Sequence, residues 1–220
     1  AIQRLKDNYV LAFTQKEAGF TTEVKETILE VDMKPITHTI ANKLKKDAIF
    51  QGRCNVIIAD TGAKLMSKLH QLYSGTCILE TGEYVVTDNS KALFIKDRFQ
   101  GKKIAIFYKF QAEYEMLKNT FGENLTNDLD EFNSTSKNIA LQIVAGREGI
   151  SLKQADCLVY LNIDFSAVSY WQSRDRLTEK DRLENEVFWI FSKGGIESRI
   201  YEAVMKKKNY TLSIFKKDGI

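Results

Sequence analysis

Short apolar runs that alternate with amphipathic segments are the feature that most constrains how this chain can fold. From Asn55 onward there are five such runs, at 56–59, 104–108, 139–144, 157–161 and 187–191. Continuous apolar runs are typical of parallel strands that are buried on both faces, and helices connect such strands. Segments with helical periodicity lie between and after the runs, at 63–73, 91–99, 112–121, 167–177 and 196–207. The alternation predicts a three-layer α/β domain in which a parallel sheet lies between helices.

The N-terminal part of the chain follows a different pattern. Residues 23–33 alternate in part between apolar and charged side chains, which predicts a half-exposed strand that ends before Pro35. Apolar residues then recur every four positions, which predicts an amphipathic helix over 36–49, at Ile36, Ile40, Leu44 and Ala48. A hairpin is expected around residues 81–83, which interrupt the strand and helix alternation.

Composition places the chain among globular proteins. It has 220 residues, of which 44% are hydrophobic and 28% charged. It has one proline and no Gly/Ser-rich linker, so we expect a single domain over 1–220 with 1–54 as an N-terminal extension. The sequence starts at Ala1 without a methionine, which favours a piece of a longer protein over simple removal of the initiator residue.

Charge, cysteine and hydropathy patterns exclude several classes of protein. The 32 basic and 29 acidic residues give a net charge of +3, which is compatible with a nucleic-acid partner without indicating one. The three cysteines form no CxxC pair and the two histidines stand apart, so neither a disulfide framework nor a metal site is expected. No apolar run reaches the roughly 18 to 20 residues that span a bilayer. We therefore expect a cytoplasmic protein with no membrane partner.

Two glycine-containing loops follow predicted strands, which is where α/β proteins bind nucleotides. The first, at 62–68, lacks the second glycine and the Gly-Lys-Ser/Thr ending of a phosphate loop. A simpler interpretation is that Asp60 or Thr61 caps an amphipathic helix whose leucines face the core, at Leu65, Leu69 and Leu72.

The second loop, AGREGISL at 145–152, directly follows a predicted strand. Gly146 and Gly149 allow close approach of the backbone to a ligand, and Ser151 offers a hydroxyl. An ordinary turn between strand and helix also explains this pattern. The next helix begins YWQSRDR and continues to EKDR, and its guanidinium groups suit a polyphosphate. Alternatively, these alternating charges form a solvated face.

The joint order of these segments resembles the C-terminal half of superfamily 2 helicase-like ATPases of the Swi/Snf kind. AGREGISL, a strand ending near Asp164, YWQSRDR and VFWIFSKGGIESRIYEAVMKKK occur in the order of motif V, motif VI and the following strand and helix. KKIAIFYKFQAEYEML is similar to motif IV, and DEFN to the segment before motif V. The resemblance runs from about Asp60 to Lys217, and its compact spacing is similar to phage or prophage members.

This resemblance implies the second RecA-like lobe of a motor, which has the P-loop NTPase fold without its own P-loop. ATP and Mg²⁺ would be bound mainly by a first lobe that is absent here. Arg176, four residues after Gln172, matches an arginine finger, and Gln172 would orient the nucleotide or the finger. Glu179 stands where the family usually has a second arginine, so Arg182 or Lys180 would replace it. Gly146, Gly149 and Ser151 would line the nucleotide cleft.

The resemblance also implies two partners, the N-terminal RecA-like lobe of the same polypeptide and DNA, with RNA as the alternative. Residues 1–54 would then be an N-terminal extension or an interlobe segment. Phosphate contacts are expected from lysines that could equally be solvated, at Lys102, Lys103, Lys109 and Lys206. Tyr108, Phe110 and Trp171 could stack on bases, although packing is the simpler role, and Trp189 is expected in the sheet core.

Two other functions remain open from the sequence. A non-catalytic RecA-like module that binds nucleic acid or protein is favoured if Glu179 means that the arginine pair has been lost. A free-standing nucleotide-binding enzyme is disfavoured because the phosphate loop is missing. If the chain is a motor lobe, the isolated 220 residues should hydrolyse no ATP.

Overall fold

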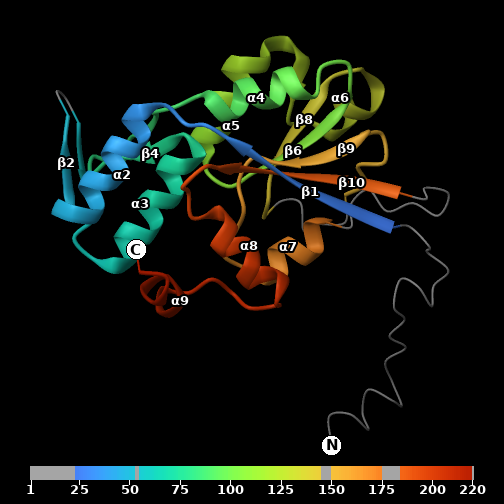
Figure 1. Ribbon diagram of the computed structural model, residues 1–220. Coiled ribbons are helices and arrows are strands. Elements are labelled where there is room, and N and C mark those ends of the chain that lie inside the picture. The colour runs from blue at the N-terminus through green and yellow to red at the C-terminus, as the bar shows by residue number, and fades with distance from the viewer. Residues whose placement is uncertain (1–22, 53–54, 145–149, 175–183, 220) are drawn as a thin grey trace, which may run out of the picture.

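The computed structural model describes residues 23–52, 55–144, 150–174 and 184–219. The centre of the molecule is a six-stranded sheet in which every neighbouring pair of strands is parallel (Figure 1). Its strand order is β1 (Glu23–Val31), β10 (Glu184–Ser192), β9 (Cys157–Tyr160), β6 (Ile104–Tyr108), β8 (Asn138–Gln142) and β7 (Leu125–Thr126). The predicted parallel sheet is therefore confirmed.

Helices cover both faces of this sheet, because alternate residues of each strand point to opposite sides. On one face, Ile106 and Val159 belong to a core that also contains Ile95 of α4 (Ser90–Arg98) and Leu117 of α5 (Gln111–Phe121). On the other face, α7 (Ala167–Arg174) and α8 (Glu197–Met205) pack against a second core, and Figure 1 shows the two helix layers on either side of the strands. Short helices follow, at η1 (Gly122–Asn124), α6 (Leu129–Ser134) and α9 (Leu212–Lys217).

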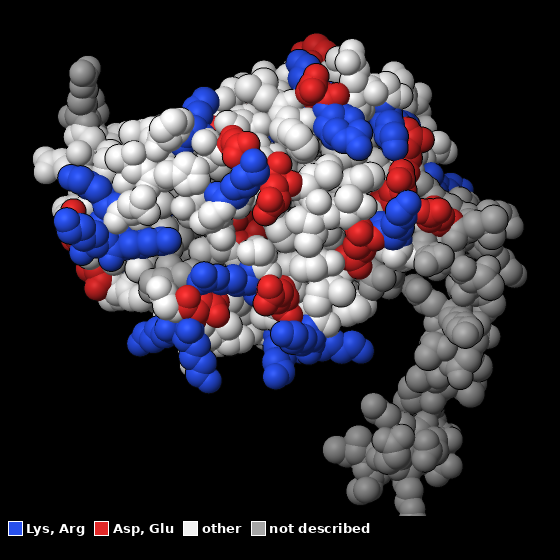
Figure 2. Space-filling model, viewed as in Figure 1, with Lys and Arg blue, Asp and Glu red and all other residues white. Residues whose placement is uncertain are grey.

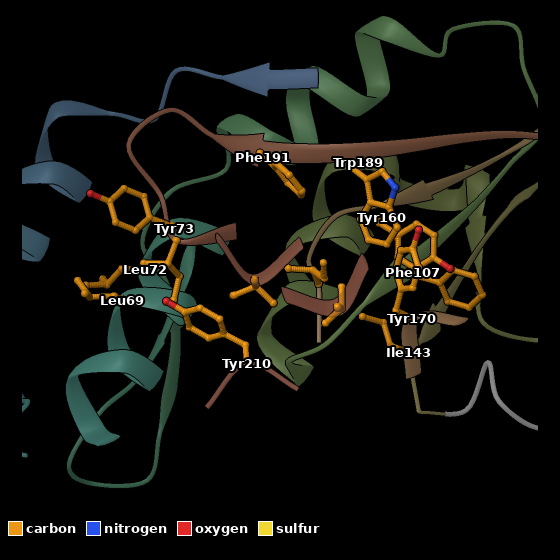
Figure 3. Close-up of a cluster of buried hydrophobic side chains, with 14 of the residues drawn as sticks. Leu69, Leu72, Tyr73, Phe107, Ile143, Tyr160, Tyr170, Trp189, Phe191 and Tyr210 are labelled. Atoms are coloured by element: carbon orange, nitrogen blue, oxygen red, sulfur yellow. The ribbon is translucent and has the colours of Figure 1, made fainter. Parts of the chain in front are cut away.

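Aromatic residues dominate the second core. Phe107, Tyr160 and Trp189 lie on three adjacent strands in register, and the rings of Tyr160 and Trp189 stack with centroids 3.9 Å apart (Figure 3). The ring of Tyr170 of α7 also stacks with that of Trp189, with centroids 5.3 Å apart. Trp189 is 1% exposed, which confirms the predicted place of this residue in the sheet core.

A small α/β segment lies between β1 and α4. It contains α2 (Pro35–Asp47), the hairpin β2 (Ile49–Gln51) and β3 (Val56–Ile58), α3 (Gly62–Ser74), and the hairpin β4 (Thr76–Ile78) and β5 (Tyr84–Val86). We call residues 34–88 the insert. The hydroxyl of Ser192, the last residue of β10, donates to the carbonyl of Tyr73 in α3, so the insert contacts the carboxyl end of the sheet.

One carboxylate joins the two ends of the insert. Asp88 accepts from the backbone N–H of Lys34 at 2.6 Å and the hydroxyl of Thr37 at 2.8 Å, at the start of α2. It also accepts from the N–H and hydroxyl of Ser90, at 2.9 and 2.6 Å, at the start of α4. Burial favours a higher pKa for Asp88, but these four donors together lower it.

Three expectations from the sequence need correction. The run at 56–59 is a strand, but it pairs antiparallel with β2 outside the main sheet. The helix predicted over 36–49 ends at Asp47, because Ala48 adopts a left-handed conformation with φ of 59° and Ile49 starts β2. Pro35 was expected only to end the preceding strand, but it occupies the first turn of α2, where no intrahelical hydrogen bond requires its missing N–H.

Other local predictions are confirmed. The strand expected at 23–33 is present as β1, and it forms the edge of the main sheet beside β10. The hairpin around 81–83 is present as β4 and β5. Within the described residues, no helix is long and apolar enough to cross a membrane.

Candidate functional site

The carboxyl ends of the parallel strands share one edge of the sheet, and the loops that leave this edge form the candidate site. The loop after β8 carries AGREGISL, of which 145–149 lie outside the described residues, including Gly146 and Gly149. Ser151 is described and exposed. The first residues of the loops after β6, β8 and β9 are all described, and hydrogen bonds and an ion pair join them.

The loop after β6 is held by a buried carboxylate. Glu113, in the first turn of α5, accepts from the backbone N–H groups of Lys109 at 2.6 Å and Phe110 at 2.9 Å. Its other oxygen accepts from the side-chain amide of Asn162 at 2.6 Å. Glu113 is fully buried, and burial raises the pKa of its carboxyl while the N–H of Phe110 and the other donors oppose that rise.

A buried histidine completes this chain of hydrogen bonds. His70 of α3 has its Nε2 2.6 Å from Oδ1 of Asn162, and its ring lies against those of Phe110 and Phe165. Burial and the cation of Lys109 lower the pKa of His70 well below its ordinary value. The side chains of His70, Asn162 and Glu113 therefore connect the insert, the end of β9 and the start of α5. We call these three residues the relay.

Lys109, a predicted phosphate contact, is already paired with a carboxylate of the same chain. Its ammonium lies 2.6 Å from the carboxylate of Asp164 and 4.3 Å from the ring centroid of Phe165. Burial favours a higher pKa for Asp164, but the charge and hydrogen bond of Lys109, together with the hydrogen bonds from Ser169 and the Phe165 N–H, lower the pKa overall. The pair ties the loop after β6 to the turn that leads into α7.

The four predicted lysines do not gather at one place. Lys102 and Lys103 precede β6, so they lie at the amino end of the strand that Lys109 follows. Lys102 lies 3.2 Å from Glu186, while the ammonium of Lys103 donates to the carbonyls that end α6, at 2.6 and 2.7 Å. Lys206 caps α8 and is exposed.

Gln172 is exposed near the end of α7. It borders an open pocket of about 390 Å³ whose other lining residues are Ala167, Val168, Trp171 and Lys207. The indole N–H of Trp171 donates to the carbonyl of Val204 at 3.2 Å, which anchors α7 on α8. Arg176 and Arg182 lie outside the described residues.

A buried ion pair that the sequence did not reveal lies at the same edge. Lys91 of α4 donates to Glu197 of α8 at 2.6 Å and to the carbonyl of Leu161 at 3.3 Å. Both side chains are almost completely buried. The only sequence signal was the position of Glu197 in the helix after motif VI, and nothing indicated its partner. His70 was likewise noted only as an isolated histidine.

The described residues offer no phosphate cradle of their own. The loop before α3 is covered by α9, since a Cβ on Gly62 would lie 3.2 Å from Leu212. Asp60 beside it pairs with Lys64 at 2.8 Å, and Thr61 caps α3 by accepting from the Lys64 N–H, which confirms the capping interpretation. In the described part of the chain, no three His, Cys, Asp or Glu residues are grouped as metal ligands. These residues therefore do not fit the triphosphate and Mg²⁺ of ATP without a second domain.

The parallel six-stranded sheet, its two helix layers and its polar carboxyl edge define a RecA-like α/β domain. No protein-family model matches the sequence, and no curated protein matches it significantly. Two solved structures give the comparison more detail. The C-terminal part of the Fun30 ATPase domain has a TM-score of 0.61 and 14% identity, with 89% of this chain and 92% of that one covered.

The second structure is the SWI2/SNF2 ATPase core domain of Sulfolobus solfataricus. It has a TM-score of 0.57 and 16% identity, and the match covers 94% of this chain but 48% of that one. The chain therefore spans about half the length of that ATPase core. At these identities the likeness establishes the fold, which is the RecA-like fold expected from the sequence.

Proposed function

We propose that this chain is the second motor lobe of a nucleic-acid-dependent ATPase of the SWI2/SNF2 kind. The observation that carries the proposal is the structural match to the C-terminal part of one such ATPase domain, which covers nearly the whole of both chains, together with the motif order along the sequence. The described residues form no phosphate cradle, and such an arrangement fits a second lobe that completes a nucleotide site begun by its partner lobe.

In this function each segment of the carboxyl edge has a role. ATP and Mg²⁺ are held mainly by the first lobe, and together they supply the phosphoryl group and the neutralising charge. Arg176 stabilises charge on the transferred phosphoryl group, with Arg182 or Lys180 as the second cation. Gln172 orients the nucleotide or the finger, and Gly146, Gly149 and Ser151 line the cleft.

The nucleic acid, DNA in this proposal, is held by its phosphates, since a translocase acts on any sequence. Lys102 and Lys206 are exposed and can reach a backbone directly. Lys103 and Lys109 are engaged inside the molecule, so any contribution of theirs to binding requires exchange of the partners described above. An RNA strand that stimulates hydrolysis where DNA does not would reassign the substrate.

The test is the Arg176→Ala variant of the complete polypeptide that includes the first lobe. Loss of an arginine finger should lower nucleic-acid-stimulated ATP hydrolysis by about three orders of magnitude and leave nucleic-acid binding unchanged. Parallel Arg182→Ala and Lys180→Ala variants identify the second cation, and Lys206→Ala should instead weaken binding. Near-normal turnover in Arg176→Ala would refute the assignment.

A non-catalytic module is the second candidate, and the specific observation in its favour is Glu179 at the place of a second arginine. It predicts that the complete polypeptide binds nucleic acid or protein but hydrolyses no ATP. In either case the isolated 220-residue chain should be inactive, and measurable ATPase activity from it would contradict both candidates.

A further inference from the structure

The amide of Asn162 fixes the state of His70. Asn162 Oδ1 accepts from the backbone N–H of Ile163 at 2.8 Å, and a backbone N–H can only donate. The Nδ2 group of Asn162 faces the carboxylate of Glu113, which can only accept when it is ionised. His70 must therefore donate through Nε2–H to Oδ1, and its Nδ1 carries the lone pair of the neutral ring.

The Nδ1 atom of His70 is buried and has no hydrogen-bond partner in the described residues. A proton placed there would be buried without an acceptor. Three charged groups act on the ring, since Lys109 after β6 and Lys91 on α4 lower its pKa while Asp164 after β9 raises it. The carboxylate of Glu113 on α5 lies beyond Asn162, to which it is hydrogen-bonded. The net effect of burial and these charges is to keep the ring neutral.

The relay is connected to both loops that carry the residues of the proposed nucleotide site. The carbonyl of Lys109 accepts from the side-chain amide of Gln142 at 2.8 Å, and the carbonyl of Tyr108 accepts from the N–H of Ile143 at 2.8 Å. These bonds fix the end of β8, from which 145–151 depart. On the other side, the ion pair of Lys109 with Asp164 fixes the turn that enters α7 and leads to Gln172.

We propose that His70 is a positioning residue which, as its neutral Nε2–H tautomer, orients Asn162 and Glu113 and so sets the starts of the loop after β8 and of helix α7. The insert thereby acts on the loops of the carboxyl edge through the buried hydrogen bond between His70 and Asn162. This role in turnover rests on the proposed ATPase function, whereas the tautomer and the relay do not.

The first experiment tests the relay in the 220-residue chain. Nitrogen-15 NMR of the histidine rings should show that His70 is protonated at Nε2 and bare at Nδ1 from pH 5 to pH 8. His70→Leu removes the donor, and His70→Gln keeps an N–H at the place of Nε2. Amide hydrogen exchange at Phe110 and Ile163 should accelerate at least tenfold in His70→Leu and remain close to wild type in His70→Gln. Exchange at Ile190, in the core of β10, serves as the reference and should not change.

Three results would overturn the relay. The first is an Nδ1–H tautomer of His70. The second is an equal acceleration of exchange at Ile190, which would indicate a loss of packing alone, and the third is an equal acceleration at Phe110 and Ile163 in the leucine and glutamine variants. If His70→Leu does not fold, the tautomer of the wild-type protein and the exchange rates of His70→Gln still decide the matter.

The second experiment tests the consequence for turnover in the complete polypeptide. His70→Leu should lower kcat for nucleic-acid-stimulated ATP hydrolysis at least tenfold with less than a threefold change in KM for ATP, and His70→Gln should restore most of kcat. Equal kcat in the wild type and His70→Leu would refute the positioning role. A wild-type polypeptide without ATPase activity would refute the proposed function, and the NMR and exchange results would still judge the relay.

Discussion

Two buried polar clusters at the carboxyl edge of the sheet each contain a carboxylate, and the two carboxylates are stabilised in different ways. The carboxylate of Glu197 is compensated by a full cation, Lys91, and one of its oxygens has no hydrogen-bond partner in the described residues. Among the described residues, no ammonium or guanidinium group donates to the carboxylate of Glu113, which is held by two backbone N–H groups and one side-chain amide.

The ion pair and the hydrogen bonds around Glu113 have different structural effects. Lys91 and Glu197 come from α4 and α8, which cover opposite faces of the sheet, so their attraction holds the two layers together. Directed hydrogen bonds around Glu113 instead set the orientation of loops, because N–H donors constrain angle more strictly than a point charge does. The ion pair should therefore dominate stability, and the relay should dominate local geometry.

The largest effect is expected for Lys91→Met. It leaves the buried carboxylate of Glu197 without its cation, which should destabilise the fold by about 3–5 kcal/mol in urea denaturation. The double variant with Glu197→Gln removes the stranded charge and should recover at least half of this loss. A cost below about 1 kcal/mol for the single variant would show that water or another group reaches Glu197.

A smaller loss is expected for Glu113→Gln. The new amide can accept through its oxygen, but its NH₂ group would face an N–H donor, which should cost about 1–3 kcal/mol. Glu115→Gln, on the exposed side of the same helix, is the matched control and should leave the urea midpoint unchanged. Equal behaviour of the two variants would mean that Glu113 is not the acceptor that holds the loop.

The relay should also make stability depend on pH. Because the pKa of His70 is lowered in the folded state, the unfolded chain binds more protons as pH falls below about 6.5, and stability then decreases. The slope from this residue reaches at most about 1.4 kcal/mol per pH unit. Denaturation of the wild type between pH 7 and pH 5 should show this decrease, and His70→Gln should flatten it. His38→Gln lies outside the relay and is the control, so an identical slope in all three proteins would contradict the buried neutral state.

The smallest effect is expected for an exposed pair with nearly the same geometry. Lys193 lies 2.8 Å from Asp32, but both side chains are largely exposed. Water screens such a pair, and Lys193→Met should leave the urea midpoint unchanged within error. A clear loss there would show that distance alone, without burial, governs the contribution of ion pairs in this molecule.

Most of the fold could be predicted from the sequence because buried parallel strands have a strong local signal. The runs that became β6, β8, β9 and β10 are continuous and apolar, and only the short run of β3 was placed in the wrong sheet. Three residues carry too little pattern to distinguish a strand of the central sheet from half of a hairpin.

The candidate site was predicted less completely. Motif order placed Gly146 and Gln172 at the site, which stays a prediction because residues 145–149 lie outside the described part of the chain. The relay was not predicted. His70 and Asn162 are 92 residues apart, and Asn162 and Glu113 are 49 apart. No periodicity or spacing connects such residues, because their hydrogen bonds exist only once the insert has packed against the strand ends. Figure 2 shows Lys and Arg side chains gathered at the left and lower rims of one face, over the insert and α9, a placement that the net charge of +3 does not indicate.

The carboxylate of Asp88 has a consequence for how this molecule can change over evolution. Because it closes the insert on itself, the chain leaves the main domain and returns to it at a single point. Segments with adjoining ends can be lengthened, shortened or exchanged without shifting the strands on either side. A substitute for residues 34–88 would need to preserve this closure and supply one hydrogen-bond donor to the oxygen of Asn162. It would also need to replace the apolar side chains that the insert contributes to the core, such as Leu69 and Leu72, and the carbonyl of Tyr73 that accepts from Ser192.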